Sequence, residues 1–233
     1  MTFGETSLAS SGRNIMKIDI YHKADADRKG EIDMKKIIVA TGNEGKMDEI
    51  RQILQGENLE FSSLKDENML DVEIIEDGAT FEENAIIKAR AISDLTGQMV
   101  LADDSGLEVD YLNGEPGIYS ARYMGEDTSY EIKNNHIIEL LEGVPDEERT
   151  ARFVCVIACA FPEGRTITAR GVIEGRIGYE EKGENGFGYD PIFYVPELGC
   201  TTAELPPEEK NKVSHRGKAL TAMYDKLHKE GIL

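Results

Sequence analysis

The sequence predicts an α/β fold in which a mixed β-sheet is flanked by helices. Predicted strands and helices alternate along much of the chain, which is typical of sheets covered by helices. One β-hairpin interrupts this alternation, because an apolar strand over residues 150–161 turns at residues 162–164 into a second strand over residues 166–177. A hairpin makes its two strands antiparallel, so the sheet is predicted to be mixed.

The composition indicates an ordinary soluble globular protein with an acidic surface. The chain has 233 residues, 40% of them apolar, which is ample length to bury a core. The formal net charge of −19 disfavours binding to nucleic acid or to an anionic membrane. A polyanionic substrate would therefore have to be attracted by a local basic pocket or by a metal ion.

Several features of the sequence favour the cytoplasm. Cys155, Cys159 and Cys200 include no Cys-x-x-Cys pair and are expected to be reduced thiols. The first ten residues lack the basic and apolar regions of a secretory signal, and no apolar run approaches the length of a membrane span. We therefore expect a soluble cytoplasmic protein with no membrane partner.

The predicted elements begin after an N-terminal extension. Residues 1–33 are polar and mixed in charge, and we expect them to form a mobile tail, with the functional domain spanning residues 34–233. The first strand is expected over residues 35–40, followed by a turn-rich loop over residues 41–46. From Lys46 on, apolar residues recur at helical spacing, so a helix should follow the loop.

A capping box follows a short predicted strand over residues 72–75. The motif Thr80-Phe81-Glu82-Glu83 places a threonine at the N-cap and a glutamate three residues on, and the helix is expected to run to about Leu95. The next strand is expected over residues 99–102. It should deliver residues 103–106 to a loop at its end.

The remaining predicted elements are short or interrupted. Residues 112–124 are rich in Gly, Pro and Tyr and should form an ordered loop. The capping box Thr128-x-x-Glu131 should open a helix, a strand is expected over residues 192–195, and the last helix should start near Ser214.

The stretch Asp103-Asp104-Ser105-Gly106 is the first candidate for chemistry. Two adjacent carboxylates repel each other, and they are tolerated most easily where a cation lies between them and an anion. Asp, Ser and Gly are also ordinary turn residues. The stretch alone therefore leaves a metal site and a plain turn as equal alternatives.

The loop from Thr41 to Lys46 (Thr-Gly-Asn-Glu-Gly-Lys) is a candidate phosphate site. It leads into a helix N-terminus, where free backbone N–H groups favour an anion, and Gly42 and Gly45 permit close approach of the backbone. It is not a Walker A loop, because Met47 stands where that motif requires Ser or Thr. The alternative is a plain turn with an exposed lysine.

Glu76 and Asp77 precede the capped helix and could join Asp103 and Asp104 in an acidic cluster. Hard oxygen ligands without His or Cys nearby indicate Mg²⁺ rather than Zn²⁺. For Glu76 and Asp77 on their own, a favourable interaction with the helix N-terminus is the simpler explanation.

Two further stretches are candidates for a nucleotide site. In Gly186-Phe187-Gly188-Tyr189-Asp190, glycines flank rings that could stack on a nucleobase, although core aromatics are the common alternative. In Lys210-x-x-x-Ser214-His215-Arg216, an ammonium, an imidazole and a guanidinium stand together in an otherwise acidic chain. A lone histidine is usually structural, but this cluster is harder to explain in that way. The segment Tyr119–Arg122 could add another cation.

Together these motifs resemble one family, the inosine/xanthosine triphosphate pyrophosphatases. Six stretches occur in one order after Met34: TGNEGK, TFEENAIIKA, LADDSGLEVD, GIYSARY, GFGYDPIF and EEKNKVSHRG. The resemblance implies an elongated, two-lobed α/β fold with a long mixed sheet and a nucleotide cleft between the lobes. It also implies a homodimer that uses Mg²⁺ to convert deaminated purine nucleoside triphosphates (ITP, dITP, XTP) to the monophosphate and pyrophosphate, cleansing the nucleotide pool.

The resemblance also implies roles for individual residues. Asp104 would accept a proton, Glu76 and Asp104 would hold the metal, and His215 and Arg216 would face the base. The residues that would contact the substrate are Thr41, Gly42, Asn43, Glu44, Gly45, Lys46, Ser105, Phe187, Gly188, Tyr189, Asp190, Lys210, His215 and Arg216. The resemblance covers the chain after Met34 and does not extend to residues 1–33.

The mechanism that we infer is metal-assisted hydrolysis at the α-phosphate. Asp104 would orient or deprotonate water, while Lys46, Lys210 and the loop N–H groups would stabilise charge on the pyrophosphate. Donors from the His-Arg pair match the 6-oxo group of hypoxanthine or xanthine but face the 6-amino group of adenine. Two alternatives stay open: a pyrophosphatase for other modified nucleotides, and a nucleotide sensor without turnover.

Overall fold

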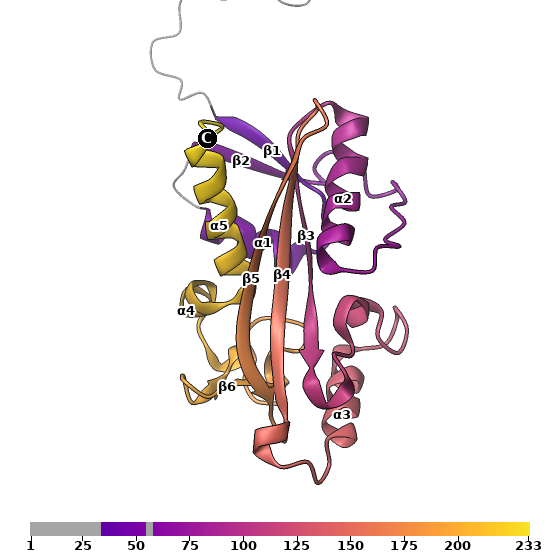
Figure 1. The fold of residues 1–233 in the computed structure, drawn as a ribbon, viewed down its shortest axis with the longest axis vertical. Helices are drawn as coiled ribbons and strands as arrows, with labels where there is room; N and C mark the ends of the chain where they lie inside the picture. Colours follow the sequence, from indigo (N-terminus) through magenta and orange to yellow (C-terminus); the bar gives the residue numbers. More distant parts are fainter. Residues whose placement is uncertain (1–33, 55–57) are drawn as a thin grey trace, which may run out of the picture. The chain divides into compact units, whose positions relative to one another are not determined.

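The computed structural model describes residues 34–54 and 58–233, so the predicted N-terminal extension lies outside the described residues. Residues 34–233 form one compact unit. Its framework is a sheet of seven described strands (Figure 1), which are Lys35–Val39 (β1), Leu59–Ser63 (β2), Val100–Val109 (β3), Thr150–Ala160 (β4), Thr166–Ile177 (β5), Phe193–Val195 (β6) and Cys200–Thr201 (β7).

The sheet mixes parallel and antiparallel pairs in the order β2-β1-β3-β4-β5-β6-β7. β1 pairs in parallel with β2 and with β3, and each later strand pairs antiparallel with the strand before it. β4 is buried along most of its length, as its run of apolar residues predicts for a strand covered on both faces. The predicted mixed α/β sheet is confirmed.

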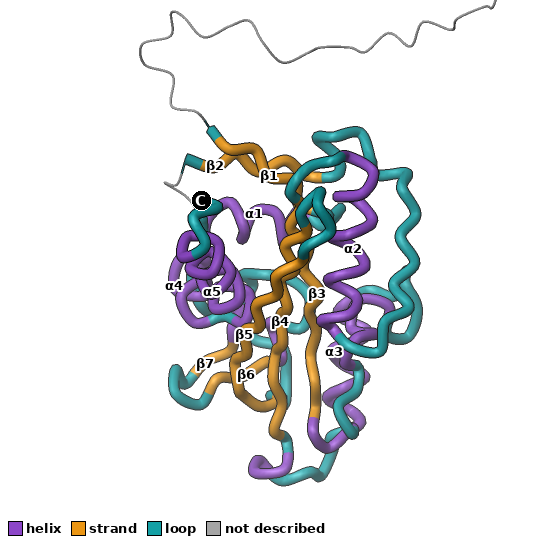
Figure 2. The backbone as a smooth tube through the Cα atoms, turned by 45° about the horizontal axis from the view of Figure 1, so that its top comes forward, coloured by secondary structure: helices purple, strands orange, loops and turns teal. Residues whose placement is uncertain are grey.

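Helices cover both faces of the sheet: Glu44–Ile53 (α1), Phe81–Thr96 (α2), Tyr130–Leu140 (α3), Pro207–Val213 (α4) and His215–Lys229 (α5). Residues of α1 and α5 share one hydrophobic cluster with β1 and β4, whereas residues of α2 share another cluster with the opposite side chains of the same strands. Figure 2 shows α5 and α2 on opposite sides of the sheet. No helix among the described residues is long and apolar enough to cross a membrane.

The edge of β3 is open along most of its length. The strand pairing of β1 with β3 is limited to Ile38 and Val39, opposite Val100 and Leu101. Beyond that point the chain after β1 leaves the sheet, while β3 continues to Val109 along β4. On the edge away from β4, the residues of β3 that follow Leu101 therefore lie beside loops rather than beside another strand, apart from an isolated bridge between Glu108 and Pro116.

The prediction of a loop at residues 103–106 is wrong. These residues lie within β3, where Asp103 is opposite Ile157, Asp104 is opposite Val156 and Ser105 is opposite Cys155. Pairing with the apolar strand β4 extends β3 through residues that, in isolation, favour a turn. As a consequence, the two aspartates point to opposite faces of the sheet.

Three other predictions need correction. The second strand is Leu59–Ser63, which pairs with β1, and residues 72–75 form no strand because no strand lies beside them. Ser129 rather than Thr128 is the N-cap of α3, accepting from the Ile132 N–H. The loop at residues 112–124 contains a 3₁₀ helix, Gly117–Arg122 (η2). The capping box at Thr80 and the Ser214 start of the last helix are confirmed.

Arg149 connects the elements at the end of the sheet distant from β1. The residue is 1% exposed, and its guanidinium donates to the carbonyl oxygens of Ile177 (2.9 Å), Leu141 (2.6 Å) and Gly178 (2.7 Å). These carbonyls belong to the end of β5 and the end of α3. The side chain thus satisfies backbone acceptors that would otherwise be buried without a partner.

We expect Arg149→Met to lower the free energy of unfolding by about 3 kcal/mol, because it leaves several buried carbonyls without donors. Urea denaturation measures the loss. The matched control is Arg51→Met, since Arg51 forms an exposed pair with Asp66 at 3.2 Å. The control should cost no more than about 1 kcal/mol. Equal losses in the two variants would contradict this role of Arg149.

Candidate active site

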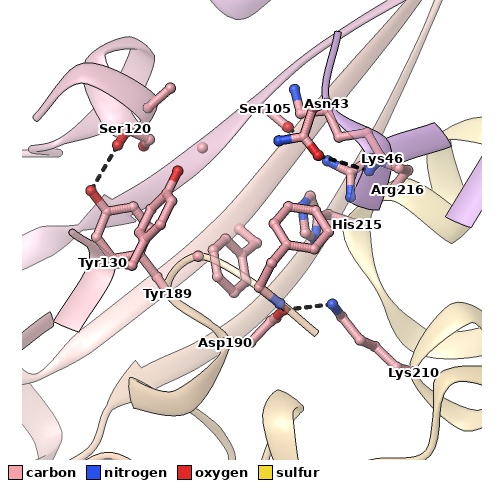
Figure 3. Close-up of a pocket in the computed structure, with 15 residues that line it drawn as sticks. Asn43, Lys46, Ser105, Ser120, Tyr130, Tyr189, Asp190, Lys210, His215 and Arg216 are labelled. Atoms are coloured by element: carbon pink, nitrogen blue, oxygen red, sulfur yellow. Dashed lines mark hydrogen bonds and ion pairs between the residues drawn. The ribbon is translucent and has the colours of Figure 1, made fainter. Parts of the chain in front are cut away.

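Two adjoining pockets lie along the open edge of β3. The first, here called the aromatic pocket, is lined by Tyr130, Phe153, Phe187, Tyr189, Lys210, His215 and Arg216, among others (Figure 3). The second, here called the acidic pocket, is lined among others by Thr41, Gly42, Glu76, Lys88, Asp103, Asp104 and Arg122. Asn43, Lys46, Ser105 and Ala121 line both pockets and therefore mark where they join.

The loop after β1 forms the start of α1 at this junction. Asn43 is the N-cap residue, and its Oδ1 accepts the Lys46 N–H at 3.0 Å. The helix begins at Glu44, two residues earlier than predicted, and Glu44 pairs with Lys65 rather than lining a pocket. A Cβ at Gly45 would lie 2.9 Å from Phe187 Cδ1, so this glycine permits close packing of the Phe187 ring.

Asp103 is committed to an internal charge network. Its Oδ2 accepts from Arg216 Nη2 (3.2 Å) and Ser105 Oγ (3.1 Å) and lies 3.0 Å from Lys46 Nζ. Burial acts to raise the pKa of Asp103, but the positive charges of Lys46 and Arg216 outweigh it and hold the pKa well below its usual range. This carboxylate is therefore ionised, and its Oδ2 is occupied, while its Oδ1 is buried without a partner among the described residues.

Asp104, on the other face, is in a different electrostatic state. Lys88 Nζ donates to its Oδ1 at 3.1 Å, while its Oδ2 is buried without a partner among the described residues. Burial raises the pKa of Asp104, and the attraction of Lys88 and Lys46 does not fully offset it. A carboxylate with a raised pKa and a free oxygen is suited to accept a proton.

Glu76 and Asp104 are the carboxylates that could hold a metal ion. Lys88 Nζ lies 2.8 Å from Glu76 Oε2, so it interacts with both. Within residues 34–54 and 58–233, no group of three or more His, Cys, Asp or Glu side chains is arranged to hold a metal. Two carboxylates nevertheless suit Mg²⁺, which commonly takes further ligands from substrate phosphates and water. The unpartnered Asp104 Oδ2 fits such a cation, whereas Asp77 is exposed and lines neither pocket.

Phe187 lies between cations in the aromatic pocket. The Lys210 ammonium is 5.1 Å and the Arg216 guanidinium carbon 5.5 Å from its ring centroid.

The His215 ring stacks on Phe153 with centroids 4.8 Å apart. Burial, with the positive charges of Arg216 and Lys210, holds the pKa of His215 well below its usual value, so the imidazole is neutral. His215 Nδ1 and Arg216 Nε are buried without partners among the described residues.

Lys210 holds the Phe187 loop in place and does not reach the acidic pocket. Its Nζ donates to Asp190 Oδ2 (2.6 Å) and Glu49 Oε1 (2.9 Å), and Asp190 Oδ2 also accepts the Phe187 N–H at 2.9 Å. Lys210 lines the aromatic pocket alone. Our sequence-based assignment of Lys210 to the pyrophosphate group is therefore corrected, because this ammonium is bonded to carboxylates beside the aromatic ring.

Tyr189 also has a structural task. Its hydroxyl donates to the Ser120 carbonyl oxygen at 2.8 Å, and its ring packs edge-on against Tyr130 at 5.3 Å between centroids. Only 3% of Tyr189 is exposed. Gly188 beside it has φ of 71°, a conformation that favours glycine. The glycine-rich loop thus turns Phe187 toward the pocket while Tyr189 anchors the loop to η2.

Sequence reasoning missed two charged residues of this region, Lys88 and Glu49. Both are 9% exposed. Lys88 lies on the buried face of α2 together with Ala85, Ala89 and Ile92, and Glu49 lies between the buried Met47 and Ile50 of α1. A charge within the apolar repeat of a helix was the available signal, because such a charge must find a partner when it is buried.

A family model described as the Ham1 family matches residues 37–226 of the chain. Similar proteins include the dITP/XTP pyrophosphatase of Geobacter sulfurreducens, which is 52% identical over 200 residues, covering 85% of this chain and 100% of the relative. The dITP/XTP pyrophosphatase of Vibrio parahaemolyticus is 50% identical over 196 residues, covering 83% of this chain and 97% of the relative.

Solved structures show the same similarity. The Ham1 protein of Staphylococcus aureus superposes with a TM-score of 0.76 at 43% sequence identity, covering 84% of this chain and 100% of that protein. The HAM1 protein of Coxiella burnetii gives a TM-score of 0.76 at 42% identity, with the same coverage. The similarity therefore extends over the fold that carries both pockets.

The buried neutral state of His215 predicts a pH-dependent stability. The unfolded chain takes up a proton on this histidine near pH 6.5, whereas the folded chain does not, so stability is lost as pH falls below that value. Between pH 6.5 and 5.5 the wild-type free energy of unfolding should fall by about 1 kcal/mol more than that of His215→Gln. Urea denaturation at both pH values measures this difference. His228→Gln, at an exposed site, is the control, and parallel pH curves for wild type and His215→Gln would contradict the prediction.

Proposed function

Because the chain belongs to the Ham1 family, we propose that it hydrolyses deaminated purine nucleoside triphosphates such as dITP, ITP and XTP to the monophosphate and pyrophosphate. The observation that carries this proposal is the junction of an aromatic pocket, suited to a base, with an acidic pocket that contains cations and a carboxylate with a free oxygen. Lys46 and Ser105 at the junction then lie beside the sugar and the α-phosphate.

The aromatic pocket supports recognition of a 6-oxopurine. Phe187 provides a ring for stacking, which contributes about 1–3 kcal/mol per base in other proteins. Arg216 Nε is a buried donor without a partner, and the neutral His215 ring carries one donor and one acceptor. A base with a 6-oxo group satisfies such a donor, whereas the 6-amino group of adenine leaves it unpaired, which a buried site disfavours strongly.

The acidic pocket supports water attack on the α-phosphorus. Asp104 accepts the proton of the attacking water, and the bond between the α-phosphorus and the bridging oxygen to the β-phosphate breaks. Lys46, Lys88 and the N–H groups at the start of α1 stabilise the charge that develops on the departing pyrophosphate. Mg²⁺, which Glu76 and Asp104 would hold, supplies charge neutralisation and Lewis acidity at the phosphate oxygens.

The central test is turnover of ITP by the wild-type chain and by Asp104→Asn in the presence of Mg²⁺. The wild type should release pyrophosphate, and the variant should lose about 100-fold or more in kcat, since a positioned general base contributes at least that factor. Asp77→Asn is the matched control and should retain activity, because Asp77 is exposed and outside both pockets. Orthophosphate as the product would exclude attack at the α-phosphorus.

A substrate panel completes this test. ITP, dITP and XTP should be turned over in preference to ATP and modified pyrimidine triphosphates, and initial rates at one low concentration give the ratios of kcat/KM. A preference for a modified pyrimidine would assign the chain another house-cleaning specificity. Tight binding of ITP without any turnover would instead identify a nucleotide sensor.

We also propose that the chain acts as a cytoplasmic homodimer. The three cysteines are free thiols, which supports a reducing compartment. Large exposed apolar side chains occur repeatedly between Tyr111 and Leu140, among them Met124 and Ile132, which supports an interface there.

Analytical ultracentrifugation tests the dimer. It should give about twice the 25.9 kDa chain mass for wild type. Ile132→Glu should shift the equilibrium toward monomer, because it places a charge in the interface. Leu198→Glu, on an exposed residue outside this segment, is the control. A monomeric wild-type chain would overturn the proposal.

A further inference from the structure

Arg122 differs from the other cations that line the acidic pocket. Lys46 pairs with Asp103, and Lys88 interacts with Glu76 and Asp104. The Arg122 guanidinium, by contrast, forms no hydrogen bond or ion pair with any residue in the described part of the chain, although the protein carries a net charge of −19. Its donors are therefore available to a ligand.

The position of Arg122 is fixed by its surroundings rather than by ion pairs. It is the last residue of η2, and its guanidinium carbon lies 4.9 Å from the centroid of the Tyr119 ring. Ser120 attaches η2 to β3, because its Oγ accepts the Leu107 N–H at 2.9 Å and donates to the Gly117 carbonyl oxygen at 2.6 Å. The side chain is half-buried, and the helix that carries it is bonded to β3 through Ser120.

The charges of the acidic pocket indicate what Arg122 can bind. The pocket is lined by three carboxylates and three cations, which are Glu76, Asp103, Asp104, Lys46, Lys88 and Arg122. Both lysines already form ion pairs with these carboxylates. An arginine offers five N–H donors in a planar fork that fits the oxygens of a phosphate. A simple solvated arginine would account for the lack of a partner, but not for its place in the wall of this pocket.

The two pockets also indicate which phosphates Arg122 can reach. Lys46 and Ser105 line both pockets and so lie near their junction, whereas Arg122 lines the acidic pocket alone. With the base in the aromatic pocket, the junction holds the sugar and the α-phosphate. We propose that Arg122 is a substrate-binding residue that donates to the non-bridging oxygens of the β- and γ-phosphates, the part that leaves as pyrophosphate. This inference rests on the proposed function for the orientation of the nucleotide.

The test is binding of inorganic pyrophosphate, measured by isothermal titration calorimetry without any nucleotide. Arg122→Ala should bind pyrophosphate about 10- to 100-fold more weakly than wild type, as expected for lost charge-assisted hydrogen bonds. Arg122→Lys, which keeps the charge but not the fork, should recover part of the loss. Inosine monophosphate should bind all three proteins within about two-fold, because it lacks the β- and γ-phosphates.

Arg165→Ala is the matched control for the lost charge. Arg165 also stacks on an aromatic ring, with its guanidinium carbon 4.4 Å from the Phe161 centroid, but it lines neither pocket. The Arg165→Ala variant should bind pyrophosphate with the same affinity as wild type. Thermal melting curves confirm that each variant is folded, and Arg122→Gln replaces Arg122→Ala if the alanine variant is not.

The outcomes separate this inference from the proposed function. If wild type binds pyrophosphate through Arg122 but hydrolyses no nucleotide of the panel, the proposed function fails and the inference stands. If wild type hydrolyses ITP but Arg122→Ala keeps kcat/KM and pyrophosphate affinity within about two-fold, the inference is overturned and the function stands. Absence of measurable pyrophosphate binding by wild type would also overturn the inference.

Discussion

The charge network around Arg216 is the interaction on which the rest of the site depends. This guanidinium, 2% exposed, bonds to Glu49 of α1 and to Asp103 of β3 and thereby connects α5 to both elements. Burying each ion costs several kcal/mol, and that cost is offset only where the ions pair closely and form further hydrogen bonds. Lys46 and Lys210 extend the pairing, since each interacts with one of the two carboxylates. Removing any one of these charges would leave a buried partner incompletely paired, so the walls of the aromatic pocket depend on the whole network.

The network also explains why two adjacent aspartates behave differently. A strand directs successive side chains to opposite faces, so Asp103 meets the cations of α1 and α5 while Asp104 meets Lys88 of α2. The first carboxylate has its pKa lowered and the second has its pKa raised. Environments that separate the pKa values of neighbouring acids are typical of sites where one acid is structural and the other reactive.

Local patterns in the sequence were sufficient to predict much of the fold and most of the pocket walls. The apolar strand before Phe161, the Thr80 capping box and the cluster at His215 each have a signal within a few residues. What could not be predicted depends on partners distant in sequence. The extension of β3 through Asp104 requires β4, the bonding of Lys210 requires Glu49, and the choice of residues 59–63 as a strand requires β1. Single-sequence patterns do not carry these long-range pairings.

The junction between the pockets has a consequence for how products leave. A nucleotide that occupies both pockets is held at its base and at its phosphates. Binding of one end keeps the other end at a high effective concentration near the pocket that binds it. In the proposed reaction the bond that breaks lies next to this junction, where Asn43, Lys46 and Ser105 line both sides. Each product then retains the contacts of only one end. In the proposed reaction, hydrolysis itself therefore abolishes the avidity that captures the substrate, and this favours release of both fragments.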